Sequence, residues 1–187
     1  MFGVLLAGIG SALDEFVNVV GKRSMRAGRE SIYTFGFLTC FIGALFLAVF
    51  GVVNGHLFFT LESLPTFIPR LVLEVLQAQL SVWAILRADR GDYGVVRILT
   101  LPLLLFFDLV LGYAVTPSQI LGIVLIIAAV LFLLYKEKFR TKALWLLIVL
   151  SVNAAFTLSL YKWDITHFNS VESEQGIIAL SIALYFF

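Results

Sequence analysis

The sequence is poor in charge and in cysteine, and both shortages exclude whole classes of protein. Only 13% of its 187 residues are charged, against about 25% in an ordinary soluble domain. The net charge is +1, so the chain lacks the basic surplus of a nucleic-acid-binding protein. The single cysteine, Cys40, cannot form an internal disulfide and excludes multi-cysteine metal sites. We therefore expect no metal, no cofactor and no nucleic-acid partner.

Hydrophobic residues are correspondingly abundant. They make up 61% of the chain and include 18 phenylalanines, whereas about 45–50% is usual. A soluble domain of this size leaves roughly a third of its surface exposed and could not hide so much apolar area. We therefore predict an all-α, polytopic helical membrane protein whose main partner is the lipid bilayer.

Apolar runs of roughly 20 residues, the length that crosses the hydrocarbon core, recur along the chain. The first run lacks the basic start and the cleavage site of a signal peptide, so it is expected to stay in the membrane. A further run begins near Gly176 and is still apolar at Phe187, which indicates a chain cut within that span. We predict a partial seventh span after six full ones, at about 2–21, 33–53, 66–86, 98–115, 118–135 and 143–161.

Basic residues concentrate in alternate connections between these spans. Eleven of the 13 lysines and arginines lie in residues 22–32, 87–97 and 136–142. Short loops rich in Lys and Arg resist translocation. We therefore predict that these three loops are cytoplasmic and that the N-terminus is external, in a plasma or cytoplasmic membrane.

The sequence also restarts after its fifth predicted span. The connection after span one is basic, whereas residues 162–175, its counterpart after span six, are mostly acidic. An odd number of helices per repeat inverts the second copy, an architecture common in secondary transporters. We expect a first five-helix repeat at 1–135, a basic linker at 136–142 and the start of a second repeat at 143–187. A shift of 140 residues aligns Ser11 with Ser151, Phe16 with Phe156 and Lys22 with Lys162.

Residues 84–135 carry a pattern that is similar to a known family. The pattern comprises Ala84-Ile-Leu-Arg87, Leu99-Thr-Leu-Pro102, Leu109-Val-Leu-Gly112, Val115-Thr-Pro-Ser-Gln-Ile-Leu-Gly122 and Ile126-Ile-Ala-Ala-Val-Leu131. This stretch resembles the end of an EamA domain, the five-helix repeat of the drug/metabolite transporter superfamily, and departs from it at Tyr113 and Ala129. The resemblance implies a five-helix inverted-repeat transporter fold with its second repeat cut short, a proline that begins a short fourth helix, and a small-molecule substrate.

Ionisable side chains inside apolar spans are costly and are functional candidates by default. In the first span Asp14, Glu15 and Asn18 lie on one polar helix face. Either carboxylate is a candidate proton or cation site, and the alternative is a face that packs against neighbouring helices. The small multidrug-resistance relatives of the superfamily use a first-helix Glu in this way, which implies the same role without choosing between the two acids.

The third and fourth spans supply the other candidates. Arg70 and Glu74 are spaced to neutralise each other as an i,i+4 pair. For Glu74 and Gln77, two roles are equally compatible with the sequence: they line a substrate cavity, or they pack against neighbouring helices. Asp108 has no charged neighbour on its own helix, so it must be protonated or must meet Arg70 or a substrate amine. In span six, Asn153 is expected to bond between helices.

The leading hypothesis is a secondary transporter that moves a small metabolite, amino acid or drug-like solute by alternating access. Proton coupling would involve Asp14, Glu15, Glu74 or Asp108. One alternative is a membrane enzyme that acts on lipid, although the acids are spread over three helices and away from both histidines. The other is a non-transporting membrane protein, including one that forms a homodimer. On the leading hypothesis we expect no enzymatic activity and no catalytic residues.

Overall fold

The computed structural model describes residues 8–10, 12–13, 16–17, 19–21, 23–24, 28, 31–87, 98–136 and 141–187. Every regular element within these ranges is helical, which confirms the all-α prediction. The described positions between 8 and 24 are helical as well. The elements that follow are α2 (Ile32–Asn54), a short 3-10 turn η1 (Leu61–Ser63), α3 (Leu64–Arg87), α5 (Thr100–Val110), α6 (Pro117–Lys136), α7 (Thr141–His167) and α8 (Val171–Phe186).

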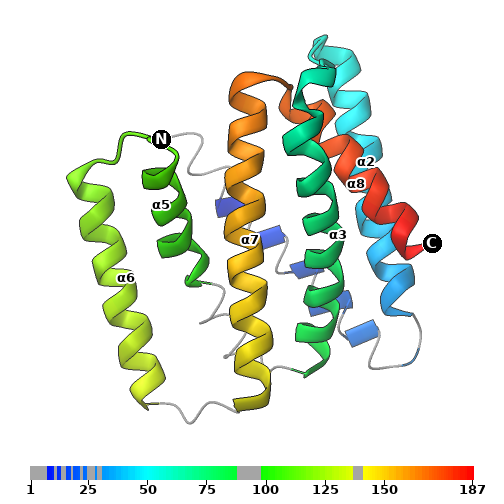
Figure 1. Ribbon diagram of the computed structural model, residues 1–187. Coiled ribbons are helices and arrows are strands. Elements are labelled where there is room, and N and C mark those ends of the chain that lie inside the picture. The colour runs from blue at the N-terminus through cyan, green and yellow to red at the C-terminus, as the bar shows by residue number, and fades with distance from the viewer. Residues whose placement is uncertain are drawn as a thin grey trace.

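The helices run alternately up and down one bundle (Figure 1). α3 and α7 pack together at its centre, α8 packs mainly against α2 on one side, and α5 joins α7 to α6 on the other. Leu80 and Ala84 of α3 form the apolar core with Leu147 and Leu150 of α7. The short connections 55–63, 111–116 and 168–170 lie at one end of the bundle, which we call the short-loop end.

Serine caps begin two of the helices. Ser31 accepts a hydrogen bond from the Tyr33 backbone N–H at 3.2 Å, and Ser170 accepts one from the Ser173 N–H at 3.3 Å. Each cap satisfies a donor that a helix start leaves unpaired. α2 and α8 therefore begin at equivalent local signals, 139 positions apart.

Local signals fix the ends of α5 and α6, which lie within the residues that carry the family resemblance. Pro102 lies in the first turn of α5. Backbone N–H groups in a first turn have no carbonyl partner within the helix, so the N–H that proline lacks costs no hydrogen bond there. Gly112 ends that helix with a left-handed φ of +79°. Thr116 and Gln119 then cap each other's backbone around Pro117, the first residue of α6. α5 is consequently short, with 11 residues, and it ends before the predicted limit of its span at 115.

Two further predicted boundaries are wrong. α7 continues to His167, past the predicted end at 161, and α8 begins at Val171 instead of Gly176. Lys162 and the two acids Asp164 and Glu174 therefore belong to helices, and both acids are completely buried. The error arose because charges mark loops only when water solvates them, and here helix packing buries both acids. The acidic loop used to support an inverted second repeat thus shrinks to residues 168–170.

Apolar side chains cover much of the outside of the bundle, whereas three charged side chains, Arg70, Asp164 and Glu174, are completely buried. On α2, Phe46 is 64% exposed and Val53 is 77% exposed, whereas Arg70 of α3 is 0% exposed. By length and composition, two described helices could cross a membrane, Ile32–Asn54 and Trp145–His167. Thr100–Val110 and Pro117–Phe132 are shorter apolar helices.

Candidate functional site

Three completely buried charged side chains meet at the short-loop end, where α3 and α8 begin and α7 ends. They are Arg70, Asp164 and Glu174. Thr66 and Asn169 bond directly to two of them, and we call these five residues the Arg70 cluster. Burial of charge is expensive unless each group is paired, so the partners within the cluster decide what it can do.

Arg70 connects three helices. Its Nη1 donates to Glu174 Oε1 of α8, and its Nη2 lies 3.6 Å from Glu74 Oε1 one turn along α3. The guanidinium carbon also lies 4.5 Å from the centre of the Tyr161 ring of α7, a cation–π contact. The predicted i,i+4 pair with Glu74 is therefore present, but the direct hydrogen bond of Arg70 goes to another helix.

Glu174 is the best-partnered acid of the cluster. Besides Arg70, it accepts a hydrogen bond from Asn169 Nδ2 at 2.5 Å. It lies in the first turn of α8, before the apolar run that starts at Gly176, and there the helix dipole favours an anion. Burial raises the pKa of Glu174, and the bonds from Asn169 and Arg70 oppose that rise. The ionised form of Glu174 therefore depends on both partners.

Asp164 is less well partnered. Its Oδ1 meets the Thr66 hydroxyl, whereas its buried Oδ2 has no hydrogen-bond partner in the part of the chain that the structure describes. Two nitrogens of Arg70, Nε and Nη2, are buried without a hydrogen-bond partner there as well. The cluster therefore combines unused donors with an unused acceptor.

Hydrogen bonds between two connections hold the short-loop end together. Ser170 N donates to Phe58 O at 3.0 Å, and Phe58 N donates to Ser170 Oγ at 3.2 Å. Thr60 adds a bond from its N–H to Asn169 Oδ1 at 2.9 Å and one from its hydroxyl to Phe168 O at 3.0 Å. The segment before α3 is thus fixed to the start of α8, next to the Arg70 cluster.

Asp108 pairs with a residue that the sequence did not suggest. Its Oδ1 lies 2.8 Å from Lys162 Nζ of α7, and the same ammonium lies 3.9 Å from the centre of the Tyr113 ring. Arg70 as the partner of Asp108 is therefore wrong. The physical reason is that α5 packs on α7, whose Lys162 it meets, whereas Arg70 bonds Glu174 on α8.

Gln77 takes part in a contact between helices. Asn153 Nδ2 donates to Gln77 Oε1 at 2.7 Å and to the Leu73 carbonyl at 3.0 Å. The predicted interhelical role of Asn153 is confirmed. The other candidates Asp14, Glu15 and Asn18 lie outside the described residues.

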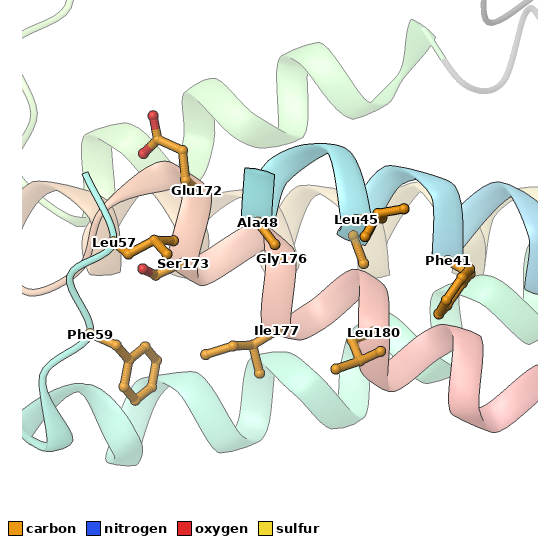
Figure 2. Close-up of a pocket in the computed structure, with 11 residues that line it drawn as sticks. Phe41, Leu45, Ala48, Leu57, Phe59, Glu172, Ser173, Gly176, Ile177 and Leu180 are labelled. Carbon is orange, nitrogen blue, oxygen red and sulfur yellow. The ribbon is translucent and has the colours of Figure 1, made fainter. Parts of the chain in front are cut away.

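A largely apolar cavity of about 510 Å³ lies between α2, α8 and the segment that precedes α3. Figure 2 shows Phe41, Leu45 and Ala48 along α2, across from Ile177 and Leu180 of α8. Polar groups enter the lining only near the start of α8. The complete lining consists of Phe41, Ala44, Leu45, Ala48, Leu57, Phe59, Glu172, Ser173, Gly176, Ile177 and Leu180.

Sequence reasoning missed Asp164, Glu174 and Asn169 as a group. A signal for Asp164 was available, because Asn153, Tyr161 and Asp164 continue one helical face at spacings of eight and three. The predicted span ends at residue 161, so Asp164 was expected to lie beyond the helix that carries this face. Nothing in the local sequence pairs Glu174 with Arg70, since their contact joins different helices.

Comparison with known proteins leaves the family open. No protein-family model matches the chain, and no curated protein or solved structure matches it. Among the described residues, histidine, cysteine, aspartate and glutamate form no group of three that could hold a metal ion.

Proposed function

We propose that the protein is a multi-pass membrane transporter of the EamA type that moves a small solute by alternating access. The distribution of its side chains supports a lipid environment. Large apolar residues such as Phe46 and Val53 face outward, while Arg70 and Glu174 pair in the interior. Charges inside an apolar bundle pair with one another and mark pathways for substrates or ions.

The packing of α2 against α8 supports the inverted repeat. These helices are counterparts under the predicted shift of 140, and their capping serines are 139 positions apart. Gly36 near the start of α2 packs against Phe186 at the end of α8, and Gly51 near the end of α2 packs against Glu172 at the start of α8. The two helices therefore run in opposite directions, as inversion requires.

The single observation that carries the transport proposal is the cavity between α2 and α8. Inverted-repeat transporters bind substrates where their two repeats meet. A volume of about 510 Å³ falls within the roughly 300–1,000 Å³ of small-molecule sites. Because most of the lining is apolar, the solute would present an apolar body, as a hydrophobic amino acid or a drug-like compound does.

Transport by the purified protein in liposomes tests this function. The probes are radiolabelled leucine, phenylalanine and a set of aromatic drug-like amines, each measured with and without a pH gradient. We expect at least one probe to accumulate faster than in protein-free liposomes. Ala48→Trp should abolish that uptake because the indole fills the cavity, while Phe46→Trp, on the exposed face of the same helix, should not.

Two results would contradict the proposal. If none of the probes moves faster than in protein-free liposomes, a non-transporting membrane protein is favoured. If uptake occurs but Ala48→Trp leaves its rate unchanged, the solute does not use the cavity between α2 and α8. The predicted coupling role of Asp14, Glu15, Glu74 and Asp108 fails if Asp14→Asn, Glu15→Gln, Glu74→Gln and Asp108→Asn all preserve the rate and its pH dependence.

A further inference from the structure

The segment between α2 and α3 forms one wall of the cavity between α2 and α8. Residues 56–60, which we call the strap, are not helical. Leu57 and Phe59 line the cavity, whereas Phe58 between them is 61% exposed, the alternation expected of an extended segment. Figure 2 shows Leu57 and Phe59 at the end of the cavity where α8 begins. The strap is therefore the wall of the cavity at the short-loop end.

This wall lies next to the polar end of the cavity. Among the described residues, only Glu172 and Ser173, in the first turn of α8, bring polar side chains to the lining. Farther along, the lining is apolar and open to the outside, with Leu45 of α2 56% exposed and Leu180 of α8 45% exposed. On the proposed function lipid covers those side chains, so a solute from water would reach the cavity at the strap.

Leu57 packs on a glycine of α2. A Cβ atom at Gly51 would lie 2.5 Å from Leu57 Cδ2 and 3.1 Å from Glu172 Cβ. Gly51 is buried, so the side chain of Leu57 rests directly on the backbone of the helix. A larger residue at position 51 would have to displace Leu57. Gly51 therefore provides the space that keeps the strap against the bundle.

The half of the strap that leads into α3 is firmly fixed. The Phe59 ring meets the ring of Phe67 edge-on, with their centres 5.1 Å apart, and Phe67 is only 5% exposed. The next residue, Thr60, donates from its N–H to Asn169 Oδ1 at 2.9 Å and from its hydroxyl to the Phe168 carbonyl at 3.0 Å. Both of these hydrogen bonds are partly buried. This half is therefore expected to stay in place.

The half of the strap that follows α2 is held more weakly. Phe58 N donates to Ser170 Oγ in an exposed hydrogen bond of 3.2 Å, and Leu57 is itself 48% exposed. Segments with exposed hydrogen bonds and few buried apolar contacts open locally at a low free energy. Gly55 precedes the strap with a φ of +66°, and glycine leaves the backbone free to rotate at that point. The strap can therefore turn about Gly55 while its other end stays fixed.

We propose that the strap is a gate, which opens when Leu57 leaves Gly51 and residues 56–58 turn away from α8. This inference rests on the transport function proposed above, and it assigns the short-loop end as a side on which the solute enters or leaves. In the closed state Ser173 lines the cavity beside Leu57 (Figure 2) and is only 9% exposed. Opening would give water access to Ser173.

Thiol reactivity tests the gate without any measurement of transport. The reporter is Ser173→Cys in a Cys40→Ser background, treated in proteoliposomes with a charged, membrane-impermeant methanethiosulfonate. Because Gly51→Ala displaces Leu57, we expect the thiol to react roughly tenfold faster, which corresponds to about 1.4 kcal/mol less for opening. Gly43→Ala, on the same helix but with open space around it, should leave the rate unchanged. Equal rates in the two glycine variants would overturn the gate.

Leu57→Ala shows which contact carries the effect. Truncation of this half-exposed side chain should itself speed the reaction, and an unchanged rate would overturn the gate even if Gly51→Ala does not fold. In the Leu57→Ala background, Gly51→Ala should add little, because the new methyl group has no leucine side chain to displace. An undiminished effect there would trace the change to Glu172 and would also overturn the proposal.

A reversible cross-link tests the gate during transport. Phe58→Cys and Val171→Cys, at positions 61% and 44% exposed, lie on either side of the contact between Phe58 and Ser170 and can be joined by a short, reducible bis-methanethiosulfonate. Uptake of a transported probe should fall to the level of protein-free liposomes and return on reduction, whereas Phe58→Cys alone should lose no uptake. Undiminished uptake by the cross-linked protein overturns the gate. Faster Ser173→Cys labelling in a protein that moves none of the probes supports the gate and contradicts the transport function, so the two failures are distinguishable.

Discussion

The Arg70 guanidinium of α3 contacts the Glu174 carboxylate of α8, although the two residues lie 104 positions apart in the sequence. Both side chains are completely buried. On the proposed division of the chain, α3 belongs to the first repeat and α8 to the second. The contact therefore joins the two repeats at the short-loop end, beside the cavity between α2 and α8. A transporter that opened at this end would have to break it.

Replacement of Arg70 should strongly destabilise the protein. Arg70→Met keeps the length of the side chain but leaves the Glu174 carboxylate buried without its cation. Loss of one partner of a buried ion pair typically costs about 3–5 kcal/mol. Unfolding in mixed detergent micelles measures the change, with Glu62→Gln as the matched exposed control. A loss no larger than that of the control would show that the pair does not hold α3 to α8.

The bond between Asn153 and Gln77 should contribute less. Asn153→Leu preserves volume but leaves Gln77 Oε1 and the Leu73 carbonyl without this donor, so we expect a loss of roughly 0.5–2 kcal/mol. Thr157→Val is the matched control, since its hydroxyl bonds only to carbonyls of its own helix. The same unfolding assay compares them, and equal effects of the two variants would argue against an interhelical role for Asn153.

Asp108 and Lys162 should form a weaker pair than Arg70 and Glu174. The Lys162 side chain is 40% exposed, so water screens the pair. A double-mutant cycle with Asp108→Asn and Lys162→Met should give a coupling below about 1 kcal/mol. A coupling as large as that between Arg70 and Glu174 would mean that the region around Lys162 is much drier than its exposure indicates.

Gly55 should resist substitution because of its backbone conformation. It ends α2 with a φ of +66°, a region that costs other residues roughly 1–2 kcal/mol. Gly55→Ala should lower the free energy of unfolding by about that amount. Gly43→Ala, inside α2 with open space around it, should be neutral or slightly stabilising. If Gly43→Ala destabilises the protein as much as Gly55→Ala does, the explanation from the backbone conformation of Gly55 is wrong.

Thiol labelling should show two sides of a membrane. The test introduces single cysteines at positions 56, 114 and 28 in a Cys40→Ser background. His56 and Ala114 lie in connections of the short-loop end, and Gly28 lies in a predicted cytoplasmic loop. A membrane-impermeant maleimide added to intact cells should label the first two positions but not the third. After the cells are permeabilised, position 28 should react as well. Labelling of all three in intact cells would contradict the predicted orientation.

Local chemistry made much of the helical framework predictable. Runs of apolar residues located all six of the helices α2, α3 and α5 to α8, because each must bury or face apolar surroundings along most of its length. The start of α6 follows from Thr116-Pro-Ser-Gln119, whose side chains satisfy their own backbone. The i,i+4 contact between Arg70 and Glu74 was equally predictable, since it is made within one helix.

Only the tertiary structure decided which charges meet. Asp164 and Glu174 were predicted to lie in a loop because their neighbours in the sequence are polar, yet helix packing buries both of them. Lys162 became the partner of Asp108 because α7 packs on α5. The sequence by itself determined where helices form, through hydrogen bonds and capping within a few residues. The pairing of charges was decided by contacts between helices. Two charges attract each other only when they are close in space, and the local sequence does not show which helices will be neighbours.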